Sequence, residues 1–361
     1  MAGHRAVLPL PPGRAPVRAG RVQREGTGLT RLWALRRHLA ERRAPAVTVK
    51  YLIEGEEEIG SVHLADVLSE HAEDLSADVV MVSDTMLWSL EEATVCTTVR
   101  GSVTATLTVR GAERDLHSGA VSGAAANAAL ELCRLVDLLS DTAGRITLPG
   151  FYDPVAPPGP ELRRSLEDMP FELSAWLADT GTFRADGEAG FTATERLWTR
   201  PAMEVARLTA GRSDSPSLGL IPSVAGADML IRLVPEQRAD QVADQLRTWL
   251  HGHRRAGYTY GLDVSSTISD PYRTPADAPA LAALTRAVGH GYGSPARPIG
   301  NGGAAPAAQL ARACEAPVLF FGTGLPGDRW HGPDERVELQ ALRLGVRTLD
   351  ALFRELPSAL R

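Results

Sequence analysis

The chain has 361 residues, of which 44% are hydrophobic, and this is enough for two domains with ordinary apolar cores. Its formal net charge of −6 argues against a nucleic-acid-binding protein, which would usually carry a basic face. No apolar run approaches the roughly 18 residues that a membrane-spanning helix needs, and the N-terminus lacks the apolar segment of a signal peptide.

The cysteines indicate a reducing compartment. Cys96, Cys133 and Cys314 are few, odd in number and far apart in the sequence. We expect them to be reduced, buried packing residues, since disulfides are rare in cytosolic proteins. The sequence therefore predicts a cytoplasmic protein.

The first 45 residues differ in composition from the rest of the chain. They are rich in arginine and contain no aspartate. Residues 5–28 have many prolines and glycines and no clear hydrophobic period, which predicts loop or disorder. Residues 29–43 are compatible with a helix.

A β-α-β pattern follows. Residues 47–53 form a short, apolar, β-branched run, and a second apolar run spans residues 77–82. Residues 59–75 between them are amphipathic and predict a helix. Two strands joined by a helix are expected to lie parallel in one sheet.

Three acidic residues lie at the ends of these two predicted strands. Glu57 and Glu58 follow the first strand, and Asp84 follows the second. Because ligands bind beyond the carboxyl ends of parallel strands, we expect the three carboxylates to converge on one sheet edge. Such crowding requires a cation or a strongly shifted pKa.

The pattern changes after residue 93. Residues 94–100 and 102–110 alternate apolar with Thr, Ser or Arg, and predict two antiparallel strands with one solvated face. A helix is expected at residues 124–139, followed by a proline-rich stretch with short elements at residues 148–212.

The same region continues with a strand, a helix and a strand. We predict strands at residues 228–234 and 261–269, with a helix from Pro235 to about residue 251, because proline is favoured in the first turn. Together with the preceding strands and helix this makes a small α+β sandwich.

The last part returns to alternating helix and strand. Helices are predicted at residues 278–291 and 337–356, and a buried strand at residues 316–321. The expected fold is therefore an α/β domain interrupted by an inserted α+β domain. We assign residues 1–97 and 271–361 to the first domain and residues 98–270 to the second.

Two further histidines lie near predicted strand ends. A glycine-rich loop after residue 321 leads to His331, and His117 lies in the segment Asp-Leu-His-Ser-Gly between a strand and a helix. Imidazole and carboxylate together suit zinc or a similar borderline metal.

Taken together, these motifs resemble the M20 family of metallopeptidases, in particular its dipeptidase branch. The resemblance covers about residues 46–361 in the right order and spacing. It rests on residues 54–61 (Glu-Gly-Glu-Glu-Glu-Ile-Gly-Ser), Ser83-Asp84, Arg100-Gly101, residues 115–119, residues 221–223 (Ile-Pro-Ser), residues 232–235 (Arg-Leu-Val-Pro), Gly302-Gly303, and His331 with Glu335.

The resemblance implies a zinc-peptidase-like α/β domain interrupted by a lid domain that also forms a homodimer. The activity implied is metal-assisted hydrolysis of amide bonds in dipeptides or small N-acyl amino acids, with zinc, manganese or cobalt as the metal. It implies that Glu57 is the general base. Glu58 and His331 resemble ligands of one metal, and Asp84 a ligand of the other.

The same resemblance assigns residues to the substrate. His117 resembles the lid histidine that stabilises the oxyanion, usually in the partner subunit's site. Arg232 and the loop with Gly302 and Gly303 resemble the residues that hold the substrate carboxylate.

The N-terminal region departs from the family pattern. The family has an upstream His-x-Asp motif and a later Gly-x-x-Asp-Asp-Lys-Gly-like turn that supplies the carboxylate bridging both metals. Here His4 is followed by Ala6 in place of the aspartate, and Leu29 or Thr30 stands where the later acids belong. About 80 to 100 residues that usually precede the first motif are also missing.

These departures predict an impaired metal site. A bridging carboxylate balances much of the charge of two close cations, so its loss weakens a two-metal site. Ala6 also removes the support for His4. His4, Asp84, Glu58 and His331 could still hold one ion, so fewer than two ions per chain are expected.

Three hypotheses remain open. The chain is an M20-type hydrolase, a non-catalytic member that binds peptides or dimerises, or a truncated or frame-shifted product. The third fits a GC-rich coding sequence, because Lys50 is the only lysine and alternative frames of such DNA read as Arg, Ala, Gly and Pro.

Structural roles are also open for single residues. The acids at 56–58 could form a solvated turn, Asp84 could cap a turn, and His331 could be a packed loop histidine. His117 could cap the following helix, and Arg232 could pair across its sheet. The substrate and the native metal are not predicted.

Overall fold

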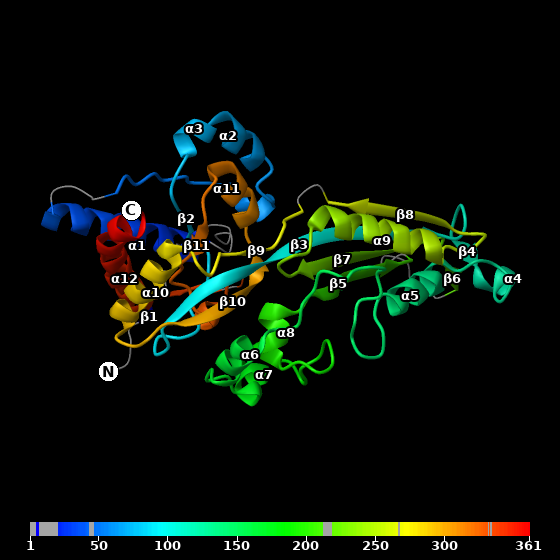
Figure 1. Cartoon of the computed structure of the whole chain (residues 1–361). Helices are drawn as coiled ribbons and strands as arrows, with labels where there is room; N and C mark the ends of the chain where they lie inside the picture. Colours follow the sequence, from blue (N-terminus) through cyan, green and yellow to red (C-terminus); the bar gives the residue numbers. More distant parts are fainter. Residues whose placement is uncertain are drawn as a thin grey trace, which may run out of the picture. The chain divides into compact units, whose positions relative to one another are not determined.

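The computed structural model describes residues 5–6, 21–42, 47–211, 219–265, 268–330, 332 and 334–361. The chain divides into two compact units, Met1–Val99 with Tyr272–Arg361, and Arg100–Pro271. The expected fold class is confirmed, because an α/β unit is interrupted by an inserted α+β unit (Figure 1). None of the described helices has the length and apolar character needed to span a membrane.

A mixed sheet forms the centre of the first unit. Strand β2 (Val80–Val82) pairs in parallel with β11 (Val318–Phe320), and β11 pairs antiparallel with β3 (Thr94–Arg110). Strands β9 (Tyr272–Arg273) and β10 (Arg297–Ala304) also pair with β3. The parallel pair β2–β11 defines the edge at which both strands end.

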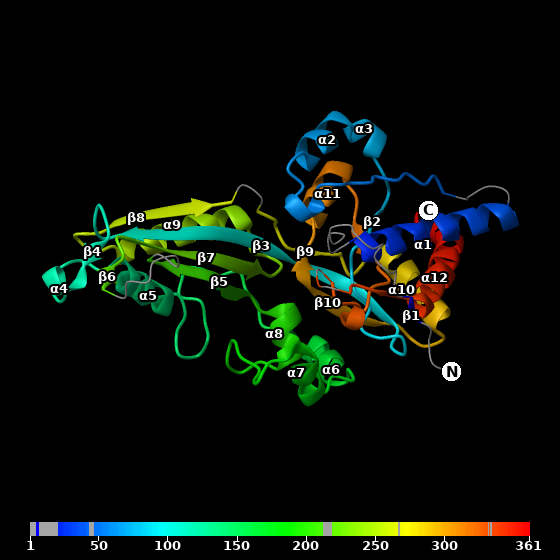
Figure 2. The same cartoon turned by 180° about the vertical axis from the view of Figure 1, so that it is seen from behind.

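Three long helices pack together in this unit. Helix α12 (Leu339–Ala359) contacts both α1 (Arg21–Arg42) and α10 (Pro279–Tyr292), as Figure 2 shows. Gly291 allows the close approach of α10 to α12, because a Cβ there would overlap the hydroxyl of Thr348. Leu284 on the apolar stripe of α10 and Leu352 on that of α12 join the buried core together with Leu319 of β11.

Shorter elements complete the first unit. Helix α11 (Ala307–Cys314) contacts α2 (Leu64–Glu70), α3 (Ala72–Leu75) and the strands β2 and β11. Strand β1 (Arg5–Ala6) pairs with β12 (Val337–Glu338) just before α12.

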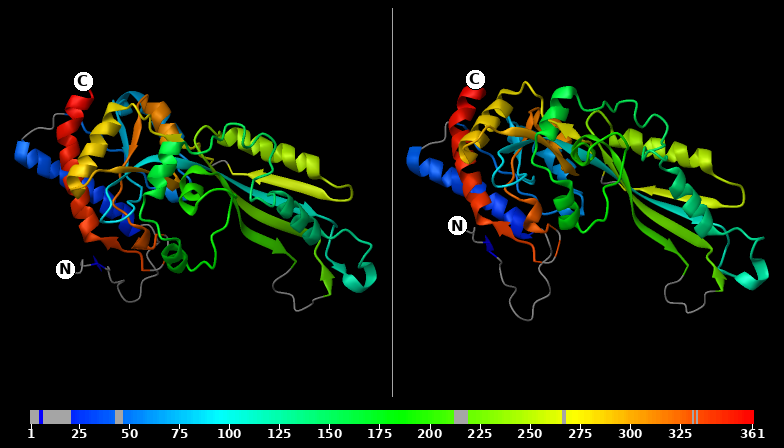
Figure 3. Two further views of the ribbon diagram at one scale, coloured as in Figure 1. Left: turned by 60° about the horizontal axis from the view of Figure 1, so that its bottom comes forward. Right: turned by 90° about the horizontal axis from the view of Figure 1, so that it is seen from below.

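The inserted unit is a four-stranded antiparallel sheet with helices on one face. The strand order is β5 (Ala202–Ala210), β7 (Val224–Leu233), the second part of β3, and β8 (Thr259–Val264). Helices α5 (Ala128–Leu138) and α9 (Ala239–His253) pack on one face (Figure 3). The strict alternation of buried and half-buried residues along β7 leaves the other face polar.

The rest of the inserted unit consists of short elements. Strands β4 (Leu116–His117) and β6 (Leu220–Ile221) pair as a small ribbon before α4 (Ser118–Val121). Between α5 and β5 the chain forms three short helices, α6 (Pro160–Glu167), α7 (Leu173–Thr180) and α8 (Ala193–Thr199).

The predicted strand at residues 47–53 is wrong. This segment has no strand pairing among the described residues, and most of its side chains are exposed, with Ile53 at 84%. A β-branched run becomes a strand only when a neighbouring strand pairs with it and a face is buried. The β-α-β prediction therefore holds only for its second strand, which lies parallel to β11 instead.

The prediction of two strands at residues 94–100 and 102–110 is also wrong. One continuous strand, β3, spans Thr94–Arg110. Gly101 is required by close packing and not by a turn, because a Cβ there would lie 2.5 Å from the carbonyl oxygen of Ser269.

Several helix predictions need correction. The helix expected from Leu29 is present but begins earlier, at Arg21, so residues 21–28 are helical and not loop. The helix predicted at 59–75 is broken into α2 and α3. Helix α9 begins at Ala239 instead of Pro235.

The prediction that Cys133 is a buried packing residue is wrong. Cys133 is exposed, because it lies opposite the buried face of α5.

Candidate active site

Asp84 lies at the carboxyl edge of the parallel pair β2–β11. The loop that follows β2 and the loop that follows β11 run side by side, because Phe321 N donates to the carbonyl of Val82 (3.0 Å) and Leu87 N to that of Gly324 (2.8 Å). Gly322 lies against the backbone next to Asp84, because a Cβ on residue 322 would overlap the carbonyl oxygen of Thr85. Asp84 is half-buried at this edge.

Helix α1 contacts the loop after β11. The guanidinium of Arg31 donates to the carbonyl oxygen of Phe321, and burial lowers the pKa of Arg31 to about 10. The indole of Trp330 packs on Gly324 in the same loop. Sequence reasoning missed Arg31, because its partner is 290 residues away in the chain.

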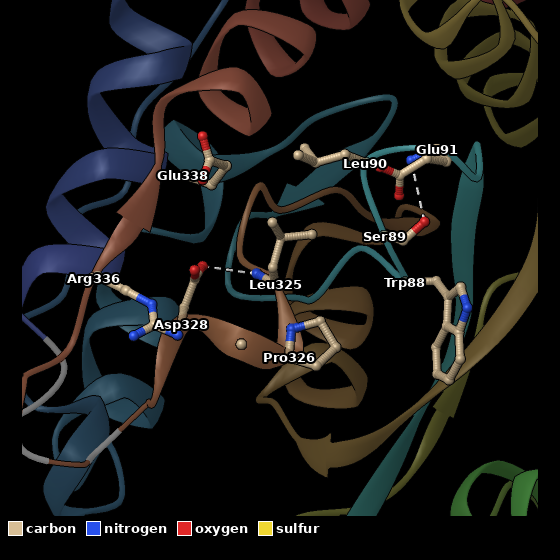
Figure 4. A pocket seen from close by; sticks show the side chains of 10 residues that line it. Trp88, Ser89, Leu90, Glu91, Leu325, Pro326, Asp328, Arg336 and Glu338 are labelled. Carbon is tan, nitrogen blue, oxygen red and sulfur yellow. Dashed lines mark hydrogen bonds between the residues drawn. The ribbon is translucent and has the colours of Figure 1, made fainter. Parts of the chain in front are cut away.

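A cavity of about 330 Å³ lies at this end of the unit. It is formed by the loops that follow β2 and β11 and by the segment before α12 (Figure 4). Asp328 lines the cavity and accepts a hydrogen bond from Leu325 N (2.8 Å). The lining combines apolar and charged side chains: Trp88, Ser89, Leu90, Glu91, Leu325, Pro326, Gly327, Asp328, Arg336 and Glu338.

Glu57 lies in a tight turn and not at a strand end. It begins the 3-10 helix η1 (Glu57–Ile59), and Gly60 closes the turn with a φ of 91° and a hydrogen bond to the carbonyl of Glu57 (2.9 Å). The neighbouring Glu56 accepts a hydrogen bond from His63 (2.8 Å), which raises the pKa of His63. Glu57 is half-buried, so the segment is not a fully solvated turn.

The predicted metal ligands are only partly among the described residues. His4, His331 and the side chain of Glu58 lie outside them, which leaves Asp84. Carboxylate and imidazole are donors that zinc binds. However, the described residues contain no group of three or more His, Cys, Asp or Glu side chains that could hold a metal ion. They therefore do not form a metal site on their own.

His117 lies in the ribbon formed by β4 and β6 in the inserted unit. Asp115 fixes this ribbon, because its carboxylate accepts hydrogen bonds from Ser223 N (2.9 Å) and Ser223 Oγ (2.8 Å). The Asp-Leu-His-Ser-Gly and Ile-Pro-Ser segments are thus brought together. The imidazole is exposed and packs on Gly119. His117 stands at the N-cap position of α4 but makes no side-chain hydrogen bond to it, so the structure does not support the alternative role as a side-chain cap.

Arg232 lies on the polar face of the inserted sheet, opposite Ser102. Burial lowers its pKa, and among the described residues it has no ion-pair partner across the sheet. Gly302 and Gly303 lie in strand β10 of the other unit, where a loop was expected. Asn301 accepts a hydrogen bond from Gly303 N (2.7 Å), which shapes this part of the strand.

Comparison with known proteins identifies the family. Residues 19–355 match Peptidase family M20/M25/M40. The Beta-Ala-His dipeptidase of Rattus norvegicus is 26% identical over 202 residues, which is 55% of this chain and 41% of that protein. The Cysteinylglycine-S-conjugate dipeptidase of Corynebacterium striatum is 25% identical over 327 residues, 88% of this chain and 69% of that protein.

Solved structures agree in fold. The M20 family metallo-carboxypeptidase Sso-CP2 from Sulfolobus solfataricus superposes with a TM-score of 0.82 at 25% identity, covering 92% of this chain and 76% of that chain. Human carnosine dipeptidase 1 gives a TM-score of 0.76 at 22% identity, over 92% of this chain and 71% of that chain.

The matches differ in how much of each relative they include. This chain spans less than half the length of the rat dipeptidase and about two thirds of that of the Corynebacterium enzyme. The family match nevertheless includes nearly the whole chain, with both units. The chain therefore belongs to Peptidase family M20/M25/M40.

Proposed function

We propose that the protein is a metal-dependent hydrolase that cleaves amide bonds of dipeptides or small N-acyl amino acids. The main support is the position of Asp84, at the end of β2 and beside the loop that continues from β11 toward His331. The dipeptidases among the relatives support the substrate class.

Glu57 is the proposed general base. Glu58, Asp84, His331 and His4 are the proposed metal ligands, for zinc or for manganese or cobalt. A metal bound there would polarise the scissile carbonyl and acidify a bound water. Glu57 would accept the proton of that water, because it is half-buried in the turn next to a ligand position.

The inserted unit and β10 supply the remaining proposed roles. His117 would donate to the developing oxyanion, since its imidazole is exposed on a ribbon that Asp115 holds in place. Arg232, Gly302 and Gly303 are the residues proposed to hold the substrate carboxylate. A half-buried arginine without an internal carboxylate partner among the described residues supports this role.

The metal site is proposed to hold fewer than two ions per chain. Ala6 and Leu29 stand where the family has an orienting and a bridging carboxylate. Leu29 is 63% exposed on helix α1 and has no donor atom for a metal. Without the bridging carboxylate, two close cations would repel each other strongly.

A second candidate function is peptide binding without catalysis. One observation favours it: Ala6 and Leu29 stand where the family has an orienting and a bridging carboxylate. In that case the arginines of the inserted unit would still bind the peptide, but no turnover would be measurable.

We also propose a homodimer through the inserted unit. Strand β5 is one of the two edges of that sheet, and its residues after Met203 are exposed. Exposed sheet edges are usually paired or covered, which supports a second copy there. A cytoplasmic location is proposed because Cys96, Cys133 and Cys314 are free thiols.

The test is hydrolysis of a dipeptide panel by the wild type and by Glu57→Gln in zinc-, manganese- or cobalt-supplemented buffer. Loss of a general base should lower the rate about a hundred- to ten-thousandfold. The matched control is Glu56→Gln, which removes the neighbouring pair with His63 and should leave the rate within about twofold. Activity that survives Glu57→Gln would mean that the chemistry lies elsewhere, and no turnover by the wild type would favour peptide binding.

A further inference from the structure

The inserted unit contains a cavity of about 430 Å³ between the loop at residues 148–155 and the beginning of helix α9. The loop lines this cavity with Gly150 and Asp153, and the segment that begins α9 lines it with Arg238, Gln241 and Gln245. The volume lies in the range of about 300–1,000 Å³ that is usual for small-molecule sites. None of the residues proposed above for catalysis, metal binding or substrate binding lines it.

Hydrogen bonds fix the two walls of the cavity. The loop consists of successive turns, because Phe151 N, Asp153 N and Val155 N each donate to the carbonyl oxygen three residues earlier (3.0–3.2 Å). Gln237 is only 4% exposed, accepts a hydrogen bond from Val234 N (2.9 Å) and donates to the carbonyl oxygen of Phe151 (3.1 Å). This buried amide joins the loop to the start of α9, so the cavity is preformed.

The carboxylate of Asp153 lines the cavity without a partner. It forms no ion pair or hydrogen bond with the described residues. It reaches the open face of Gly150, where a Cβ would lie 3.3 Å from Asp153 Oδ2 and 3.4 Å from Gln245 Nε2. The glycine thus leaves a space between the carboxylate and the amide. Other acids of this unit are paired: Glu131 with Arg134, Glu188 with Arg145 and Arg200, and Asp228 with Arg207.

Two side-chain amides of α9 also line the cavity. Gln241 and Gln245 are four residues apart, so they share one face of the helix, and neither side chain forms a hydrogen bond with the described residues. Gln245 Oε1 is buried without a partner, which is unusual for a polar atom. Rotation of this amide about its last side-chain bond would turn Oε1 toward the space at Gly150 that Nε2 now faces.

Arg238 places a positive charge at the same cavity. One terminal nitrogen of its guanidinium donates to Asp240 (3.0 Å), and the side chain is 54% exposed. A guanidinium has five N–H donors, so Arg238 retains donors for an acceptor in the cavity. The lining therefore combines an acid without a partner, a base with donors to spare, and amides that can both donate and accept.

A zwitterion matches this lining. Its cationic end would donate to Asp153 and to the amide oxygen of Gln245, and its anionic end would accept from Arg238. A free amino acid carries both charges and is small enough for a cavity of this volume.

We propose that this cavity binds a free amino acid, with its ammonium group on Asp153 and Gln245 and its carboxylate on Arg238. The site is made by other residues than those proposed for hydrolysis and does not depend on that function. The inserted unit then has a ligand site of its own.

The test is calorimetric titration of the full-length chain. The probe is L-alanine, and the comparison compounds are propionate, which lacks the ammonium group, and ethylamine, which lacks the carboxylate. Wild type should bind L-alanine at least about tenfold more tightly than either compound, because each of them loses charge-assisted hydrogen bonds.

The variants are Asp153→Asn, Arg238→Met and the control Asp137→Asn. Asp153→Asn keeps the size of the side chain and should weaken L-alanine binding about ten- to a hundredfold. It should fold normally, because Asp153 is exposed and its carboxylate makes no bond in the described structure. Arg238→Met should weaken binding at least about tenfold. Asp137 is an exposed acid on α5 outside the cavity, so Asp137→Asn should bind like wild type.

Three results would overturn the inference. The first is no measurable binding of L-alanine by wild type, and the second is equal binding of the three compounds. The third is wild-type affinity for L-alanine in either cavity variant, which would place the amino acid elsewhere, for example among the residues proposed for hydrolysis. An equal loss in Asp137→Asn and Asp153→Asn would also contradict it, because the effect would then come from net charge and not from the cavity.

Discussion

The buried ion pair of Glu188 and Arg200 should make a large contribution to the stability of the inserted unit. Their side chains are 3% and 4% exposed, and Arg200 donates through Nε (2.8 Å) and a terminal nitrogen (2.9 Å) to the two carboxylate oxygens. Breaking a buried pair by removing one partner costs about 3–5 kcal/mol, because the other charge stays buried. Arg145 is 45% exposed and contributes less.

We therefore expect Glu188→Gln to lower the free energy of unfolding by about 3 kcal/mol, the low end of that range, because glutamine keeps one acceptor oxygen. This is a substantial fraction of the roughly 5–15 kcal/mol that stabilises a typical domain. The assay is urea unfolding followed by circular dichroism, with the free energy extrapolated to water at an unchanged m-value.

A double variant separates the ion pair from packing. Arg200→Met together with Glu188→Gln removes both charges, so its cost should be smaller than the sum of the two single costs by at least about 1 kcal/mol. A loss below about 1 kcal/mol for Glu188→Gln alone, or strict additivity in the double variant, would refute the reasoning.

Three further predictions follow from the structure. Gly322→Ala should lower the free energy of unfolding by about 1–3 kcal/mol in the same urea assay, because the new Cβ would overlap a neighbouring backbone oxygen. The hydrogen bond from Arg134 chiefly lowers the pKa of Glu131. The ionised Glu131 therefore stabilises the fold above its unfolded pKa of about 4.3, and this contribution is lost as the pH falls through the folded pKa. Glu131→Gln should flatten the acid side of a curve of unfolding free energy against pH. The pKa of His63 is raised by its hydrogen bond to Glu56, so its NMR titration midpoint should lie above about 6.5 and fall in Glu56→Gln.

Strands with one buried face could be predicted from sequence. The alternation in residues 228–234 predicts β7, and in the structure this strand begins earlier, at Val224. The apolar run at 47–53 has similar composition, yet it forms no strand in the described structure, because strand formation depends on a partner that composition does not reveal. The break predicted between residues 100 and 102 does not occur, and the packing neighbour of Gly101, Ser269, is likewise distant in sequence.

The part of the candidate site that depends on local sequence patterns could be predicted. The position of Asp84 followed from the rule that ligands meet the carboxyl ends of parallel strands, although β11 and not residues 47–53 is the parallel neighbour. The contact of Arg31 with Phe321 and the placement of Arg232 opposite Ser102 depend on helix packing and strand register. Neither is encoded in a local pattern.

The metal content of the purified full-length chain tests the proposed function most directly. The protein is dialysed against a weak chelator and analysed for zinc, manganese and cobalt. We predict at most one tightly bound ion per chain, because Ala6 and Leu29 replace the orienting and bridging carboxylates that a pair of metal ions needs. Retention of two equivalents of zinc per chain would contradict this account.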